Sequence, residues 1–237
     1  MSIETSYVID FKTKNISFLK LHAYLRNRGV KNNKFFLRLY NKNLQGVNPH
    51  SPLLNRQQKD WVLAEIKQNP YYYLREVALI STPAGKSKFI LHPGNLAITW
   101  AIFNSFDQLS LLPRQQFKTV SIAAALTWVY DFGAENTQML FGNKSLGDAA
   151  NNLSRFKDVR YNHPDYLKQA IMRPATDIDN QESLKSDLTN NSIKIAGQPK
   201  TVADADKQGK LHTALTLLTD WEILTMYMEG QSAARQV

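Results

Sequence analysis

The sequence of 237 residues contains no cysteine and no long uninterrupted apolar stretch. Without cysteine the chain forms no disulfide, no thiolate zinc site and no cysteine nucleophile. No run approaches the ~18 apolar residues that a membrane-spanning helix needs. The first residues also lack the basic leader and apolar block of a secretory signal. These absences are compatible with a protein of a reducing cytoplasm.

Acidic residues are scarce in the first quarter of the chain. Residues 1–60 carry 11 Lys and Arg against the three acids Glu4, Asp10 and Asp60, whereas the remaining charges nearly balance. Most of this surplus consists of cations interleaved with Phe, Leu and Tyr, namely Lys12, Lys14, Lys20, Arg26, Arg28, Lys31, Lys34, Arg38 and Lys42. Such a face suits nucleic-acid phosphates. A solvated basic surface explains the surplus equally well, so both interpretations stay open.

Metal-ligating patterns are also scarce. The five histidines are scattered and show no ligand spacing. The acids Asp177, Asp179, Glu182 and Asp187 lack the glycine and ligand order of an EF-hand loop. We therefore expect residues 173–191 to form a solvated loop or hairpin rather than a cation site.

Helical and strand-like patterns alternate through the rest of the chain. With 43% hydrophobic residues, the chain has enough apolar side chains for a folded core. Apolar periodicity predicts helices, in pieces broken near Gly29, over 15–44 and further helices over 55–68, 94–106, 119–132 and 145–160. Short apolar runs predict strands over 89–91, 109–112, 137–141 and 215–218. This alternation favours an α/β fold whose sheet has parallel crossovers.

Two places resemble the end of a phosphate-binding loop. Residues 84–87 read Ala-Gly-Lys-Ser, but a strand and a turn follow them, so no helix would point its N-terminus at a phosphate. That segment is better explained as a hairpin tip. Residues 112–119 lack both glycines of the common motif, yet they lie between a predicted strand and a predicted helix. In this second loop Lys118 and Thr119 are the candidates for contacting phosphate and Mg²⁺.

Six sequence segments, taken in their order along the chain, support residues 112–119 as the phosphate loop. They are residues 69–77 (Asn-Pro-Tyr-Tyr-Tyr-Leu-Arg-Glu-Val), 92–97 (His-Pro-Gly-Asn-Leu-Ala), 112–119 (Leu-Pro-Arg-Gln-Gln-Phe-Lys-Thr), 139–145 (Met-Leu-Phe-Gly-Asn-Lys-Ser), 205–210 (Ala-Asp-Lys-Gln-Gly-Lys) and 215–222 (Leu-Thr-Leu-Leu-Thr-Asp-Trp-Glu). Their order resembles the ATPase half of the large subunit of tailed-phage terminases, over roughly residues 15 to 228. In that family a Pro-Arg-Gln-x-Gly-Lys-Thr loop replaces the glycine-led one.

The resemblance implies a P-loop NTPase-like fold, with a mostly parallel sheet flanked by helices. A basic, mainly helical N-terminal subdomain would cover 1–68, and the ATPase core would cover 69–237. It implies an ATP hydrolase with ATP and Mg²⁺ as cofactors, which moves double-stranded DNA into the procapsid. The partners would be the portal protein, the small terminase subunit and identical subunits in a ring. The location would be the host cytoplasm and, transiently, the portal. The nuclease domain of the family has no counterpart here, and an excised domain and a natural truncation both stay open.

The resemblance also assigns roles to individual residues. Asn95 takes the place of an adenine-sensing amide, with the aromatic run at 71–73 as packing around the base. Asn143 and Lys144 would border the nucleotide, Lys210 would replace a family arginine, and Thr119 and Asp220 would hold Mg²⁺. The phosphate loop would consist of Pro113, Arg114, Gln115, Gln116, Phe117, Lys118 and Thr119.

Two departures from the family pattern lead us to expect weak hydrolysis. Phe117 stands where the family has glycine, so its ring would narrow the loop or force it open. Trp221 stands where a water-activating glutamate follows the Mg²⁺ aspartate, and the next acid is Glu222. In a continuing strand, residues 220 and 222 would share a face, which makes Glu222 a candidate base. The alternatives are a nucleotide-binding module with little or no hydrolysis and a DNA-binding accessory domain.

Overall fold

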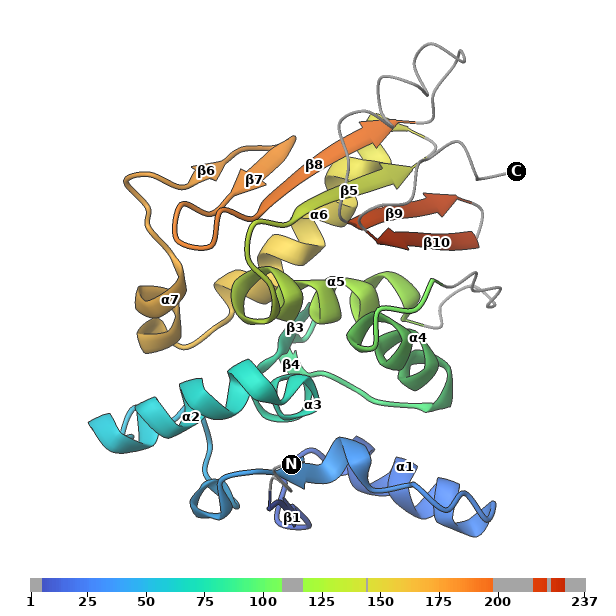
Figure 1. The fold of residues 1–237 in the computed structure, drawn as a ribbon, viewed down its shortest axis with the longest axis vertical. Helices are drawn as coiled ribbons and strands as arrows, with labels where there is room; N and C mark the ends of the chain where they lie inside the picture. Colours follow the sequence, from blue (N-terminus) through green and yellow to red (C-terminus); the bar gives the residue numbers. More distant parts are fainter. Residues whose placement is uncertain (1–5, 108–116, 144, 198–214, 221–222, 229–237) are drawn as a thin grey trace, which may run out of the picture.

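Three sheets and a set of helices make up the mixed α/β fold of this computed structural model (Figure 1). The structure describes residues 6–107, 117–143, 145–197, 215–220 and 223–228. The largest sheet has the strand order β10-β9-β5-β8-β7-β6, and two small two-stranded sheets pair β1 with β2 and β3 with β4. The predicted α/β class is therefore confirmed.

The largest sheet is parallel only at its centre. Strand β5 (Gln138–Asn143) lies between β8 (Ser192–Gly197) and β9 (Leu215–Asp220) and runs parallel to both. The outer strands β10 (Ile223–Met228), β7 (Ser183–Lys185) and β6 (Ile178–Asp179) pair antiparallel with their neighbours. Connections of a few residues join these outer strands, and such short connections permit only antiparallel pairing. Two of the five strand pairings are parallel, so the described sheet is mixed rather than mostly parallel as expected.

Two helices pack against this sheet and contribute most of the helical residues of its core. Helix α6 (Leu146–Tyr161) follows β5, and helix α5 (Lys118–Trp128) precedes it and continues as a π-helical turn, Val129–Gly133. Apolar side chains of both helices pack against β5 and β8 in one cluster that includes Ile122, Leu126, Phe141, Leu153, Phe156 and Ile193. Helix α7 (Asp165–Ile171) leads from α6 toward the β6–β7 hairpin.

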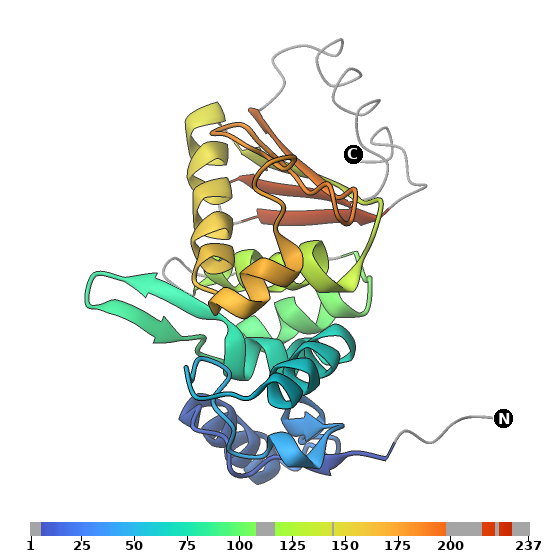
Figure 2. The same ribbon diagram turned by 90° about the vertical axis from the view of Figure 1, so that its left-hand side faces the viewer.

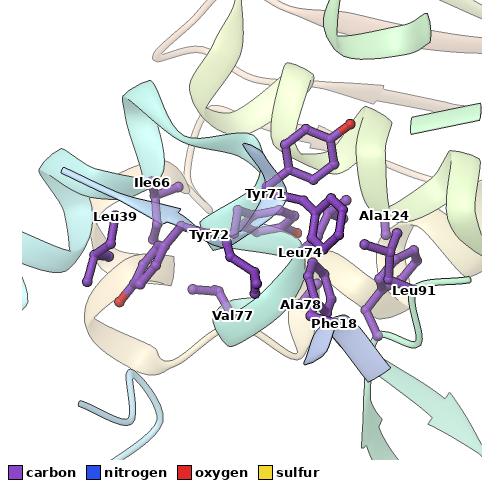
Figure 3. Packing of buried hydrophobic residues seen from close by; sticks show 14 of the residues in the cluster. Phe18, Leu39, Ile66, Tyr71, Tyr72, Leu74, Val77, Ala78, Leu91 and Ala124 are labelled. Carbon is purple, nitrogen blue, oxygen red and sulfur yellow. The ribbon is translucent and has the colours of Figure 1, made fainter. Parts of the chain in front are cut away.

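The N-terminal part of the chain shares its core with later residues. It consists of β1 (Val8–Ile9), α1 (Ile16–Asn27), a 3-10 turn (Phe35–Leu37), β2 (Arg38–Leu39), a second 3-10 turn (Lys42–Leu44) and α2 (Arg56–Gln68). Its side chains, such as Phe18, Leu39 and Ile66, pack with residues from the segment 71–91 and with Ala124 of α5 (Figure 3). The boundary expected after residue 68 therefore does not separate two hydrophobic cores.

Buried ionic and polar groups also bind the N-terminal part to the rest of the chain. Arg75 is buried and pairs with Asp10 (3.4 Å) and Glu76 (3.2 Å), and it donates to the carbonyl of Phe36 (2.8 Å). The amide of Asn15 donates to the carbonyls of Arg75 (3.0 Å) and Phe89 (2.8 Å). Removing one partner from such a buried network is costly because the other charge stays unpaired.

Most predicted helices are confirmed, and one predicted strand is wrong. Helix α2 and helices α4 (Pro93–Phe103), α5 and α6 match the expected ranges to within a few residues. The strand expected over 89–91 is absent there. Instead β3 (Leu79–Thr82) pairs with β4 (Gly85–Lys88), and Phe89 and Leu91 are buried in irregular backbone. Their apolar character reflects core contact rather than strand pairing. The strand expected over 109–112 lies outside the described residues.

Two further expectations can be compared with the structure. Residues 173–191 contain the antiparallel β6–β7 pair, which confirms the expected hairpin. Within the described ranges, no helix has the length and apolar character that crossing a membrane requires.

Candidate functional site

Helix α5 begins with an unusual backbone conformation at Phe117. This residue is the N-cap and adopts the left-handed region, with φ 54° and ψ 20°. Glycine is the residue that occupies this region without cost. The Phe117 carbonyl accepts from the N–H (2.9 Å) and the hydroxyl (2.8 Å) of Ser121, which stabilises the first turn. The backbone therefore keeps a glycine-like conformation although the residue is phenylalanine.

The Phe117 ring points toward solvent. It is 55% exposed, and its nearest aromatic neighbour is His92, with ring centroids 6.4 Å apart. We expected this ring to narrow the loop or force it open. Over the described residues the ring is instead directed outward while the backbone turns into the helix. Lys118 and Thr119 follow as the first two residues of α5 and are partly buried.

The carboxyl ends of three parallel strands meet at one edge of the main sheet. Asn143, the last residue of β5, is in register with Gly197 of β8 and with Thr219 of β9, and Asp220 follows as the last residue of β9. The arrowheads of these strands and the start of α5 lie on the same side of the molecule (Figure 1). Open α/β sheets bind ligands at this edge. Asn143 and Asp220 thus share the edge that the sequence predicted.

A second helix begins at the same edge. Ser145 caps α6 by accepting from the N–H of Asp148 (3.1 Å), and its hydroxyl donates to the Asp148 carboxylate (2.7 Å). A side chain on Gly197 would lie only 3.3 Å from the Leu146 nitrogen. The end of β8 therefore approaches the α6 backbone closely, which favours glycine at this position.

Asn95 is buried at the start of α4 and serves the backbone. Its Oδ1 accepts from the N–H of His92 (2.7 Å), its Nδ2 donates to the Ile90 carbonyl (2.7 Å), and the His92 ring accepts from the Asn95 N–H. A carboxamide has a second N–H and a second lone pair, but burial limits access to them. The role at adenine stays a prediction, and the observed geometry is that of a helix cap.

The aromatic run at 71–73 belongs to the core. All three tyrosines are buried, and Tyr71 packs edge-on against Phe35 and Phe103. Burial raises the pKa of Tyr72 and Tyr73 well above the ordinary value. The expectation that these rings pack around a base is wrong, because their side chains already fill the interior.

The rejected phosphate loop at 84–87 is a hairpin. Strands β3 and β4 pair antiparallel, with Lys86 opposite Ser81, and the hairpin extends away from the body of the molecule (Figure 2). Ser87 lies within β4, and irregular backbone follows the strand up to residue 92. No helix begins at this segment to direct backbone N–H groups at an anion. The prediction of a hairpin tip is confirmed.

The strand that leads to Asp220 is slightly longer than the expected range 215–218, because β9 ends at Asp220. Strand β10 pairs antiparallel with β9 so that Ile223 lies opposite Asp220. The expectation that residues 220 and 222 share a strand face involves Trp221 and Glu222, which lie outside the described residues, so it stays a prediction. Several predicted site residues lie outside the described residues, namely Pro113, Arg114, Gln115, Gln116, Lys144, Lys210 and Glu222.

Metal-ligating side chains do not converge within the described ranges. No group of three or more His, Asp or Glu residues there could hold an ion. The carboxylate of Asp177 accepts from the backbone N–H groups of Arg173 (2.9 Å) and Asp187 (2.8 Å), and Asp179 pairs with Lys157 (2.6 Å). The acidic stretch is thus part of the hairpin structure. The Mg²⁺ roles of Thr119 and Asp220 stay predictions.

Buried ionisable groups cluster where α5 and α6 end. Arg160 pairs with Asp131 (2.9 Å) and lies 4.0 Å from Asp177. Burial raises the pKa of Asp131, against the opposing effect of Arg160. Nearby, His163 is buried against the Tyr73 hydroxyl (2.9 Å), and burial lowers its pKa to about 3. Sequence patterns contain no sign of this cluster, since its members are up to 90 residues apart.

Comparison with known proteins leaves the resemblance as a hypothesis. No protein-family model matches the chain, and no curated protein matches it.

Proposed function

We propose that the carboxyl edge of the main sheet, together with the start of α5, binds a nucleoside triphosphate, as in P-loop ATPases. The observation that carries this proposal is the left-handed N-cap at Phe117 followed by Lys118 and Thr119 as the first helical residues. The backbone N–H groups of a helix start are unpaired within the helix and attract anions. Lys118 adds a formal positive charge at the same place.

Each residue at this edge has a defined task in the proposed site. Lys118 would contact the β- and γ-phosphates, with Arg114 adding charge, while Asn143 and Asp220 would border the phosphates from the ends of β5 and β9. The hydroxyl of Thr119 and the carboxylate of Asp220 are oxygen donors of the kind that Mg²⁺ prefers, so the two residue types fit this ion. When bound, Mg²⁺ would neutralise charge on the phosphate oxygens.

Hydrolysis at this site is proposed to be slow. In-line attack on the γ-phosphate needs a positioned group that orients or deprotonates water, and a general base contributes typically ~10²–10⁴-fold. Trp221 follows Asp220 directly in the sequence, at the position where the family has its water-activating glutamate. Nucleotide binding with weak turnover is therefore the form of the activity that we propose.

The wider role rests on the resemblance alone. We propose that the chain is the ATP-binding motor domain of a terminase large subunit of the P-loop NTPase type. In this role the chain would act on double-stranded DNA. Its partners would be the portal protein, the small terminase subunit and other copies of the chain. The strand order of the main sheet does not bear on these partner assignments.

The test compares two lysines in different settings. A fluorescent, slowly hydrolysed ATP analogue would be titrated with Mg²⁺ against the wild type, Lys118→Ala and Lys86→Ala. Loss of Lys118 should weaken binding by roughly 10–100-fold, because a charged hydrogen bond contributes about 1.5–3 kcal/mol. Lys86 is exposed on the β4 strand, so Lys86→Ala should bind like the wild type.

The opposite result would move the site. If Lys86→Ala abolished binding and Lys118→Ala did not, the nucleotide would belong at the β3–β4 hairpin and the proposal would fail. Absence of binding by the wild type would reject nucleotide recognition altogether.

A further inference from the structure

The exposed cations of α1 and of the turn that follows it form a distinct surface, which we call the basic end. It comprises Lys20, Arg26, Arg28, Lys31 and Lys34, all exposed. We infer that the basic end binds the sugar–phosphate backbone of duplex DNA. This inference concerns a surface remote from the proposed nucleotide site, and it stands whether or not that site binds ATP.

The acidic side chain that could neutralise this surface is buried. Asp10 is the only acid between residues 6 and 59. It is 1% exposed and pairs with the buried Arg75. The carboxylates of Glu65 and Glu76, which accept from Asn41 and Thr13 of the N-terminal part, are buried as well. Among residues 6–59, the positive charge of the basic end is therefore presented to solvent without an exposed carboxylate, which distinguishes this segment from an ordinary mixed surface.

The turn that carries the cations has a fixed backbone. Gly29 has φ 74°, its N–H donates to the Arg26 carbonyl (3.0 Å), and the Val30 N–H donates to the Leu25 carbonyl (3.1 Å). These two bonds constitute a Schellman motif, the usual helix end at a left-handed glycine. Beyond it, the carbonyl of Asn33 contacts the buried His22 ring (2.9 Å). The backbone that carries the cations is thus held by defined hydrogen bonds.

Two exposed tyrosines of the N-terminal part favour backbone contact over base stacking. The Arg28 guanidinium lies over the Tyr24 ring (4.8 Å), and the Arg38 guanidinium lies over the Tyr7 ring (4.4 Å). Each of these rings already has a cation on one face. Single-strand binding needs open aromatic faces for bases, whereas a guanidinium held by a ring keeps its N–H edge for phosphate.

The exposed side of α1 also differs from a membrane-binding helix. Ile16, Lys20, Tyr24 and Arg28 follow one another at four-residue intervals, so apolar and cationic side chains alternate along it. A helix that lies in a lipid surface presents one continuous apolar face. The alternation suits a charged polymer better than a bilayer.

The position of the basic end separates it from the sheet edge. In both views α1 lies at the opposite end of the molecule from the main sheet (Figures 1 and 2). Loss of Lys118 should therefore leave DNA binding unchanged, and loss of the basic end should leave nucleotide binding unchanged. The failure of one proposal can be told from the failure of the other.

The test measures the salt dependence of binding to a short labelled duplex by fluorescence anisotropy. The variant combines Arg26→Gln, Arg28→Gln, Lys31→Gln and Lys34→Gln. Each neutralised phosphate contributes about −0.9 to the log–log slope, so removal of four cations should flatten the slope by up to about 3.6. Between about 50 and 200 mM salt, the wild type should lose roughly 10²-fold more affinity than the variant.

A matched control carries the same change in net charge. It combines Lys86→Gln, Arg155→Gln, Lys185→Gln and Lys194→Gln, four exposed positions on β4, α6, β7 and β8. This control should keep the wild-type slope. An unchanged slope in the basic-end variant, or equal flattening in the control, would overturn the inference. So would tighter binding to a single strand of the same length, or binding to phosphatidylserine vesicles without binding to the duplex.

Discussion

Phe117 combines a backbone conformation that favours glycine with a large aromatic side chain. A left-handed conformation costs an L-residue roughly 1–2 kcal/mol, since Cβ approaches the following carbonyl. Phe117 adopts it at the start of α5 while its ring is 55% exposed, so little burial offsets the cost. Strained backbone of this kind is retained where the surrounding structure requires it, often at functional sites.

We predict that glycine is the more stable replacement at this position. Phe117→Gly should exceed Phe117→Ala in free energy of unfolding by about 1 kcal/mol, because alanine keeps Cβ in the left-handed region and glycine does not. Urea denaturation of both variants measures the difference. Both changes remove the ring, so the effect of removing it cancels in the comparison. An alanine variant as stable as the glycine variant would show that residue 117 is not left-handed in solution.

Protonation of His163 on unfolding makes the stability of the protein depend on pH. Burial lowers its pKa to about 3, so the folded protein keeps the ring neutral where the unfolded chain, with a pKa near 6.5, takes up a proton. The unfolded state then binds more protons between these two values. Stability from this group is complete above pH 6.5 and is lost as the pH falls toward 3. Asp131, whose pKa burial raises, acts with the opposite sign above its ordinary value of 3.8.

We predict that His163→Gln flattens the acid side of the stability profile. The difference in unfolding free energy between the wild type and this variant should change by up to about 1.4 kcal/mol per pH unit below pH 6.5, with the wild type losing more. Denaturant titrations at several pH values between 5 and 7.5 measure it. The comparison isolates His163, since Asp131 is present in both proteins. A constant difference across this range would contradict the assigned pKa.

At the scale of elements, a close contact between a glycine and a tryptophan shapes the end of α5. The Trp128 ring donates from Nε1 to the Ile66 carbonyl (2.7 Å), which fixes its orientation against α2. The π-helical turn then returns the backbone over this ring, so a Cβ on Gly133 would lie 2.5 Å from it. The direction of the chain into β5 therefore depends on the absence of a side chain at residue 133.

We predict that Gly133→Ala destabilises the protein by about 1–3 kcal/mol, the usual cost of overpacking a fixed site. The matched control is Gly147→Ala in the first turn of α6, where the new Cβ would meet nothing closer than 3.9 Å. There the change should stabilise by about 0.4–1 kcal/mol through the lower entropy of the unfolded chain. Thermal and urea unfolding distinguish the two. Equal effects at both glycines would mean that the Trp128 ring moves freely.

At the scale of the whole molecule, the buried residues form two clusters, and each cluster contains residues from distant parts of the sequence. One joins α5 and α6 to the sheet, and the other joins the N-terminal part to the segment 71–91 and to Ala124 of α5. Helix α5 contributes to both. The proposed nucleotide edge lies at the start of this shared helix, and the basic end lies beyond the second cluster (Figure 1). Helix α5 thus begins at one proposed binding surface and packs, through Ala124, in the cluster that includes the N-terminal part.

Local sequence patterns determined the helices, the mixed class and the choice between the two phosphate-loop candidates. Helix α2 could be predicted because a capping residue, Asn55, precedes its apolar stripe and Pro70 follows it. A hairpin tip near residues 84–87 could be predicted because no helical pattern directly follows Ser87, although its second strand is Gly85–Lys88 and not the expected 89–91. The break near Gly29 could also be predicted, because glycine is the residue that a left-handed helix end requires. These features depend on interactions between residues only a few positions apart.

Tertiary structure alone decided the strand order, the antiparallel pairing of β10 with β9 and the burial of the aromatic run at 71–73. An apolar tripeptide such as 89–91 looks the same whether it pairs in a sheet or fills a core. Tyr71 was expected at a base but lies in the interior, because Phe35 and Phe103, more than 30 residues away on either side, close around it. Asp10 likewise is drawn from the surface by Arg75, 65 residues later. These outcomes depend on contacts between distant residues, which local periodicity does not encode.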